Sequence, residues 1–344
     1  MDWIAGWGSR KSHTLTGSTA GPQTNYPVSI TVHYGSGSDT DDNVYCDENC
    51  RTDFGDIRFT KADGKSLLQY WLDPASIVES DKAEFWVKVD SIPDSPGTVD
   101  IYIYYGKEVA TTSDGEATFL MFDDFPGTSL HGDWTQNLGP TASITVSGGI
   151  LTLDSGGANS ICAITREGGG VMGSYRVIYR FAVKASYAVV NNIGTPGWYR
   201  NSYYNRWAWW YSGRQHLYGT ADFNWHTMEA RPSGNHWMVY LDNVYKATNP
   251  DTTTATKVGL NSSGQSDASH GGKTQYTTII VKTYCSPEPT HTAWGSEEHP
   301  ISEEFPALLI IAPLLVAVFI LILSTTKNKA RVRASHIKSL YCQF

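Results

Sequence analysis

The densest group of side chains that could bind a ligand lies between residues 198 and 211, where eight of fourteen residues are aromatic. Because side chains alternate between the faces of a strand, Trp207 and Trp209 share one face and Trp210 points to the other. One face must be core, and the other can stack rings on the apolar face of a sugar; the alternative is that both faces are packed. The candidate glycan-binding residues are Trp198, Tyr204, Arg206, Trp207, Trp209, Trp210, Tyr211, Arg214 and His216.

A second group of candidate ligands lies in the acidic loop DTDDN, at residues 39–43. Carboxylate and amide oxygens at close spacing suit Ca²⁺. The loop lacks the glycine and the distal glutamate of an EF-hand, and solvated acidic turns are common, so both interpretations stay open. The candidate calcium ligands are Asp39, Asp41, Asp42 and Asn43.

The catalytic patterns that we sought are absent from the sequence. Retaining glycoside hydrolysis needs two carboxylates roughly 5–5.5 Å apart, which an E-x-D-x-x-E run on one strand supplies. No such run occurs: Glu229 stands alone in HTMEARP, and Glu288 lies between two prolines. The G-x-S-x-G, H-E-x-x-H and P-loop patterns are also absent. We therefore expect that the protein is not an enzyme.

The elements that must position these residues are expected to be strands. The chain has 32 Gly, 12 Trp and 20 Tyr, and only 17% of its residues are charged, which suits short strands and tight turns better than a helical bundle. Period-2 alternation predicts strands at 26–34, 56–60, 83–90 and 99–106, separated by turn-forming residues. We expect an all-β fold of two β-sandwich, jelly-roll-like domains.

The charge balance is mildly acidic. There are 26 Lys and Arg against 34 Asp and Glu, a net charge of −8, and no long basic stripe precedes the C-terminal region. The sequence therefore gives no indication of nucleic-acid binding.

The first 121 residues carry a specific resemblance. The ordered motifs GWGSRKSHTLT, CRTDFGDIRFTKADGKSLLQYWLD, AEFWVKVDSIP and IYIYYGKEVATTSDG resemble the family numbered 2341 among domains of unknown function. That family occurs in archaeal and bacterial surface proteins, commonly ahead of other extracellular β-domains. The resemblance implies a β-rich module over 1–121 and a location at the cell surface.

Residues 122–294 carry a second, less specific resemblance. The hairpin signature FNWHTMEARPSGNHWMVYLDN at 223–243, together with YTTIIVKTY near the end, resembles the concanavalin A-like jelly roll of laminin-G and legume-lectin type. Domains of that type bind glycans, act as spacers or hydrolyse glycosides. Residues 295–304 follow as an acidic linker.

Residues 305–323 (FPALLIIAPLLVAVFILIL) contain no charged residue. A helix of this length reaches roughly 28 Å, close to the hydrocarbon thickness of a bilayer, whereas a buried core helix would not suit its apolar surface. Glutamates precede the segment and a basic tail, 324–344, follows it. The positive-inside rule therefore predicts a single-pass anchor in the cell membrane, with 1–304 outside and the tail cytoplasmic. A basic cluster after an apolar span also resembles archaeal C-terminal sorting signals, in which the span can be cleaved off. The tail here is longer than in those signals, so we expect that the span is not cleaved and remains as the anchor.

Export leaves several questions open at the sequence level. The segment MDWIAGWGSRK has no apolar region of a signal peptide, so a processed start, a start assigned too far downstream and another export route all remain. Cys46 and Cys50 are a candidate disulfide, whereas Cys162 and Cys285 pair or stay free thiols. Asn261, in a polar segment, is a candidate N-glycosylation acceptor.

Two functions fit these observations. The first is a membrane-anchored surface protein that acts as a non-catalytic binding module for glycans or for another cell's surface. The second is a structural subunit of a surface layer, sheath, filament or viral envelope spike, which requires self-association. Calcium is a candidate cofactor of either, and the bilayer, glycans and surface proteins are the expected partners.

Overall fold

The computed structural model describes most of the chain up to residue 300. The described ranges are 3–108, 113–157, 159–168, 175–184, 198–201, 206–211, 214–234, 236–249, 256–263 and 271–300. Residues 1–298 form one compact unit, and residues 299–344 form a second. The expected membrane segment at 305–323 and the tail at 324–344 lie outside the described ranges. Within those ranges, no helix is long and apolar enough to span a membrane.

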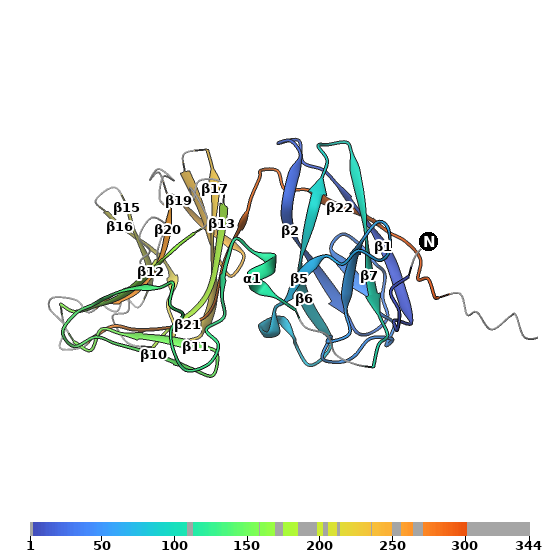
Figure 1. Cartoon of the computed structure of the whole chain (residues 1–344). Coiled ribbons are helices and arrows are strands. Elements are labelled where there is room, and N and C mark those ends of the chain that lie inside the picture. Colours follow the sequence, from blue (N-terminus) through green and yellow to red (C-terminus); the bar gives the residue numbers. More distant parts are fainter. Residues whose placement is uncertain are drawn as a thin grey trace, which may run out of the picture. The chain divides into compact units, whose positions relative to one another are not determined.

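The first sandwich consists of two four-stranded sheets (Figure 1). One has the order β22-β1-β7-β4, with β1 Ser9–Thr16, β4 Arg58–Lys61, β7 Thr98–Tyr105 and β22 Thr290–Trp294. The other has the order β3-β2-β6-β5, with β2 Gln23–His33, β3 Asn43–Tyr45, β5 Gln69–Leu72 and β6 Lys82–Ile92. A 3-10 turn, η1 (Pro74–Ser76), follows β5, and its N-cap is the carboxylate of Asp73, which accepts from the Ala75 backbone N–H.

Alternation builds the core of the first sandwich, as the sequence predicts. Phe85, Val87 and Val89 of β6 point inward and are fully or almost fully buried. They share one hydrophobic cluster with Ile101 and Ile103 of β7, in the opposite sheet. The strands expected near 26–34, 56–60, 83–90 and 99–106 are therefore confirmed as β2, β4, β6 and β7.

The second sandwich is built on an eight-stranded sheet. Its order is β10-β11-β21-β13-β17-β18-β19, with β8 beside β21; the bounds are β8 Met121–Asp123, β10 Ser143–Ser147, β11 Ile150–Asp154, β13 Tyr175–Val183, β17 Trp225–Ser233, β18 His236–Leu241, β19 Val244–Asn249 and β21 Lys273–Thr283. Two three-stranded sheets accompany it, β20-β12-β9 and β14-β15-β16, with β9 Thr135–Leu138, β12 Ile161–Glu167, β14 Trp198–Asn201, β15 Arg206–Tyr211, β16 Arg214–Thr220 and β20 Lys257–Ser263. The expectation of an all-β fold is confirmed for the described residues, whose helical elements are one short helix, α1 (Gly115–Thr118), and η1.

One core fills the second sandwich. Val177, Tyr179 and Phe181 of β13 are fully buried and face Ile164 of β12 and Leu260 of β20. The opposite face of the eight-stranded sheet is partly covered by the first sandwich. There Ile178 and Ile280 pack in a third cluster with Trp71, Trp86, Phe119 and Phe122, next to α1.

The chain returns to the first sandwich after completing the second. Strand β22 pairs antiparallel with β1, and the backbones of Arg10 and Glu298 exchange two hydrogen bonds. The Arg10 guanidinium also donates to Glu298 at 2.6 and 2.8 Å. Residues 290–294, which the sequence analysis assigned to the second domain, and Glu298, which it assigned to a linker, thus belong to the first sandwich. The second sandwich is an insertion between β7 and β22.

The buried His13 and the half-buried His291 help to hold β22 on β1. His13 Nε2 lies 2.7 Å from His291 Nδ1, and the His13 ring stacks on Trp294 at 3.7 Å. Burial, and then the neighbouring His291, lower the pKa of His13 to about 3, and burial also lowers the pKa of His291. Both rings are therefore neutral in the folded protein at neutral pH.

This pair should make the first sandwich sensitive to acid. A histidine whose folded pKa lies below its unfolded value, near 6.5, costs no stability above pH 6.5 and costs more as the pH falls below it. We expect the free energy of unfolding to drop by on the order of 2 kcal/mol between pH 6.5 and 4.5 because of this pair. The H13N/H291N double variant should show a flatter profile in denaturation curves. The exposed His236→Asn variant is the control, and an equally flat profile for that control would contradict the assignment.

Candidate functional site

A β-bulge in β21 places two adjacent hydroxyl-bearing residues on the outer face of the eight-stranded sheet. Arg180 of β13 pairs with Thr278, and Phe181 pairs with Tyr276, so Thr277 has no opposite residue. Tyr276 and Ile279 both face the core, and between them Thr277 and Thr278 are both half-buried. The bulge therefore places two neighbouring threonines between core-facing residues, where a regular strand would place only one.

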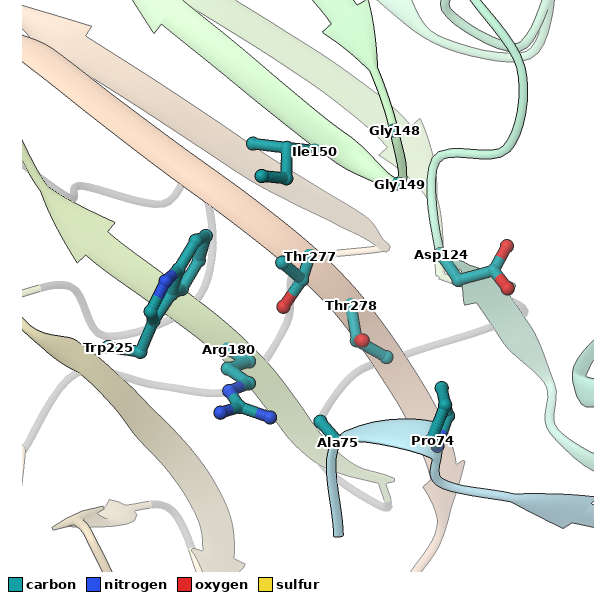
Figure 2. Close-up of a pocket in the computed structure, with 10 residues that line it drawn as sticks. All are labelled: Pro74, Ala75, Asp124, Gly148, Gly149, Ile150, Arg180, Trp225, Thr277 and Thr278. Carbon is teal, nitrogen blue, oxygen red and sulfur yellow. The ribbon is translucent and has the colours of Figure 1, made fainter. Parts of the chain in front are cut away.

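Two larger side chains stand beside the threonines. Trp225 of β17 pairs with Ala182, and Arg180 pairs with Thr227, so Trp225 and Arg180 are diagonal neighbours on the same outer face. Figure 2 shows the Arg180 guanidinium between the Trp225 ring and Ala75. An aromatic ring, a guanidinium and the Thr278 side chain thus converge on one place.

These residues line an open groove of about 450 Å³, within the usual size range of ligand sites. Pro74 and Ala75 of η1 form one wall, and Ile150 with the turn Gly148–Gly149 forms another. Asp124 lies at the far end from Arg180 (Figure 2). Burial raises the pKa of Asp124. The groove therefore has a cationic, aromatic end and an acidic end.

Arg180 differs from the other described arginines of this sandwich in its contacts. Among the described residues it makes no hydrogen bond and no ion pair, and it acts through space to lower the pKa of Asp73 against the larger effect of burial. Arg176 lies four residues earlier on the same face of β13. It donates to Glu229 at 2.7 and 3.1 Å and to Glu288 at 3.3 Å. Arg166 donates to the Phe122 carbonyl and to Asp133.

The surroundings of Trp225 are also polar. Lys184 Nζ lies 5.5 Å from the centre of the Trp225 ring and donates to the Phe223 carbonyl at 3.0 Å. His226, the next residue, contacts Asp242 at 2.7 Å and Asp222 at 2.8 Å, one through each ring nitrogen. The hydrogen bond to Asp242, and that to Asp222, raise the pKa of His226 against the effect of burial. This triad fixes the turn beside the groove.

A layer of buried charges adjoins the groove. Lys282, which is 1% exposed, donates to Glu288 at 3.0 Å and to the Pro27 carbonyl at 3.2 Å. Burial lowers the pKa of Lys282 to about 8. Burial alone would raise the pKa of Glu288, but Lys282 and Arg176 outweigh it and lower that pKa to about 2. Tyr26 of the first sandwich donates to the same carboxylate at 2.7 Å, so Glu288 connects the two sandwiches.

One carboxyl near this layer, that of Glu84, has a raised pKa, whereas the pKa of Glu288 is lowered. Burial, and then the nearby Asp73, raise the pKa of Glu84 on β6 to about 7, although Arg176 acts against them. Glu84 is linked to η1, since its backbone N–H donates to Ser76 Oγ at 2.7 Å and its carbonyl accepts from Asp73. The wall of the groove formed by η1 is thus held by β6.

The aromatic cluster predicted from the sequence lies on the hairpins β14–β15–β16. Trp198 pairs with Trp209, and Trp209 pairs with His216. Tyr204 and the side chains of the other candidates, including Arg206, Trp207, Trp210, Tyr211 and Arg214, lie outside the described part of the structure. Their assignment to a glycan site stays a prediction.

Residues of the candidate calcium site at 39–43 make contacts with other parts of the chain. Asp39 accepts from Lys11 Nζ and from the Tyr45 backbone N–H, both at 2.8 Å. The Asn43 amide contacts His33 and donates to Asp42, while the Asp41 carbonyl accepts from the Trp294 indole. The Asp39 carboxylate and the Asn43 amide thus have partners already, and the described residues contain no group of three or more His, Cys, Asp or Glu side chains suited to a metal ion. Calcium binding by this loop stays a prediction.

The cysteines and Asn261 also differ from expectation. Cys46 and Cys50 are free thiols in the first core, so the predicted disulfide is absent, and burial raises the pKa of Cys46. Cys162 and Cys285 are also free thiols and do not pair with each other. Asn261 lies on strand β20 and is only 8% exposed, so it is not the exposed glycosylation acceptor that the sequence suggested.

Sequence reasoning missed the residues of the groove. A signal existed: Arg176 and Arg180 occupy the non-core positions of an otherwise apolar strand, and the Thr-Thr pair interrupts the alternation of β21. Trp225 was used only to recognise a hairpin. The contribution of Pro74 and Ala75 had no local signal, since it depends on how the two sandwiches pack.

Comparisons with known proteins bear on the two modules. Residues 53–137 match the family described as "Domain of unknown function (DUF2341)", which confirms that resemblance over this range and not over the whole chain. No curated protein matches the sequence.

Solved structures resemble the chain at low identity. A sialidase matches with 12% identity and a TM-score of 0.38 over 62% of this chain and 22% of its own. The GH43 protein BlXynB from Bacillus licheniformis matches with 12% identity and a TM-score of 0.38, over 59% and 47% of the two chains. A glycoside hydrolase family 16 endo-glucanase from Bacteroides ovatus matches with 12% identity and a TM-score of 0.35, over 47% and 99%. These matches are compatible with the expected jelly-roll sandwich, and no site residue is carried over from them.

The expectation that the protein is not an enzyme is contradicted by these comparisons, because glycoside hydrolases recur among the similar structures. Its premise was also too narrow. Glu229 and Glu288 look isolated in the sequence, whereas the fold brings both to the guanidinium of Arg176. Pairs of carboxylates need not come from one strand.

The buried charge layer predicts a large effect for Arg176. Its removal in Arg176→Met leaves Glu229 and Glu288 each short of a cation in a buried site, and we expect a loss of about 3 kcal/mol in the free energy of unfolding. Urea denaturation followed by tryptophan fluorescence measures the loss. Arg51→Met is the matched control, since Arg51 pairs with the exposed Asp53 and its removal should cost far less stability. Similar losses for the two variants would show that the layer contributes little.

Proposed function

We propose that this protein recognises glycans, and that the groove beside Trp225 is the recognition site. The observation that carries the proposal is the convergence of the Trp225 ring with Arg180 and Thr278 in an open groove. An indole ring can stack on the apolar face of a pyranose, while guanidinium and hydroxyl groups fix the sugar's polar substituents. The acidic end, at Asp124, supplies a hydrogen-bond acceptor for further sugar hydroxyls.

The groove suits an extended ligand. It is open to solvent, and its walls come from β11, β13, β17 and β21 of one sandwich and from η1 of the other. An open groove across a sheet admits an internal stretch of a polysaccharide, whereas a closed pocket admits only an end. The aromatic hairpins at 198–211 are a second candidate contact for such a chain.

Trp225→Ala should abolish retention of the protein on a glycan array, because the stacking surface is lost. The half-buried ring lies on the outer face of the sheet, so folding should persist and be visible in an unchanged circular dichroism spectrum. Tyr245→Ala, at a residue 52% exposed on the edge strand β19, is the control and should bind as the wild type does. Equal binding by the Trp225 variant would exclude this groove as the site.

We further propose that the protein acts at a cell surface, anchored through residues 305–323, in adhesion or in recognition of another cell. The support is the uncharged span between acidic and basic flanks. On expression of the full chain, residues 1–298 should be degraded by protease added to intact cells while the basic tail is protected. A chain that alkaline carbonate releases from the membrane would contradict the anchor.

A further inference from the structure

The strongest unexplained feature of the groove is the free guanidinium of Arg180. Each other arginine whose side chain is described has a hydrogen-bond or ion-pair partner: Arg10, Arg51, Arg58, Arg166, Arg176 and Arg231. Arg180 has none among the described residues, although it is half-buried on the sheet. Without a partner among the described residues, this guanidinium keeps its five N–H donors available to water or to the acceptors of a ligand in the groove.

The position of Arg180 limits what that ligand can be. Its planar fork of donors matches a carboxylate in a two-bond arrangement, which neutral sugar hydroxyls cannot reproduce. The neighbouring Trp225 ring would then carry the sugar to which the carboxylate is attached. Lys184, whose Nζ lies 5.5 Å from the centre of that ring, adds a second positive charge at the same end.

The carboxylates near this end of the groove make other contacts, and Asp222 and Asp242 both contact His226. Asp73 accepts the Ala75 backbone N–H at its η1 cap and forms no ion pair with Arg180. Asp124 stands at the opposite end of the groove from Arg180 (Figure 2). The arrangement gives the groove a direction, with an anion favoured at Trp225 and hydroxyl donors favoured at Asp124.

We propose that the groove selects acidic glycans, with Arg180 binding the carboxylate of a sugar acid whose ring stacks on Trp225. This rests on the proposed glycan recognition and names the class of ligand. Arg180 is then the residue that determines specificity, and Trp225 the residue that contributes affinity for any sugar. A sulfated sugar presents a different anion to the same guanidinium and is the competing ligand in the test.

The test compares sugars that differ only in charge. The full chain is titrated calorimetrically with trigalacturonate, with its carboxyl-reduced trimer and with a sulfated galactose trimer. We expect the carboxylate to bind at least tenfold more tightly than the neutral trimer and than the sulfated trimer. The preference over the neutral trimer should shrink as salt is raised.

Variants assign the preference to one side chain. Arg180→Gln should bring trigalacturonate binding down to that of the neutral trimer and leave the neutral trimer unchanged. Arg180→Lys, which keeps the charge but not the fork, should retain only part of the preference. Arg51→Gln makes the identical substitution at an exposed pair and should keep the full preference.

The outcomes separate this inference from the proposed function. If the neutral trimer binds as tightly as trigalacturonate and Trp225→Ala abolishes both, glycan recognition stands and selection for acids is wrong. If the sulfated trimer binds most tightly, the anion is assigned wrongly. If Arg180→Gln keeps the preference, Arg180 is not its source. If no sugar binds at millimolar concentration, both proposals fail.

Discussion

The packing of the two sandwiches depends on a set of charged and polar side chains that hydrogen-bond to one another where the sandwiches meet. Arg176 and Lys282 come from the eight-stranded sheet, Glu288 from the segment that leaves it, and Tyr26 from the first sandwich. Each buried charge would be costly alone, and each is tolerated because the others satisfy it. Trp86 lies 5.3 Å from the Lys282 ammonium and 5.6 Å from the Arg176 guanidinium, and so continues this layer into the aromatic cluster with Trp71 and Phe119. The polar layer orients the contact, and the aromatic cluster supplies its apolar area.

The groove is a consequence of that packing. The first sandwich covers only part of the outer face of β13 and β21, and the uncovered part begins where η1 ends. Arg176 and Arg180 illustrate the boundary, because they occupy the same face of one strand, four residues apart. The first pairs with two carboxylates, and the second has no hydrogen-bond or ion-pair partner within the described part of the chain. One strand thus contributes both to the cohesion of the molecule and to its candidate site.

Local sequence patterns predicted the strands because alternation is a property of each strand alone. Phe85 and Val87, or Ile101 and Ile103, show their burial in the sequence itself. Contacts over long separations were not predictable: Glu288 between two prolines gave no sign of Arg176, and Asn261 in a polar run gave no sign of a buried strand. The acidic loop at 39–43 showed suitable ligand types, but Lys11 and His33, which take those groups, lie elsewhere in the sequence. Residue types indicate what chemistry is available, whereas the fold decides which groups remain free.

The return of β22 to the first sandwich has a mechanical consequence. The chain from the second sandwich to residue 300 passes along β22, which is bonded to β1 and fastened by the pair Arg10 and Glu298. A pull between a ligand held in the groove and the residues beyond 300 is therefore transmitted through β22 before it reaches any strand of the second sandwich. The hydrogen bonds of one edge strand would bear the load first, and peeling β22 from β1 would release chain length before any strand of the second sandwich is loaded.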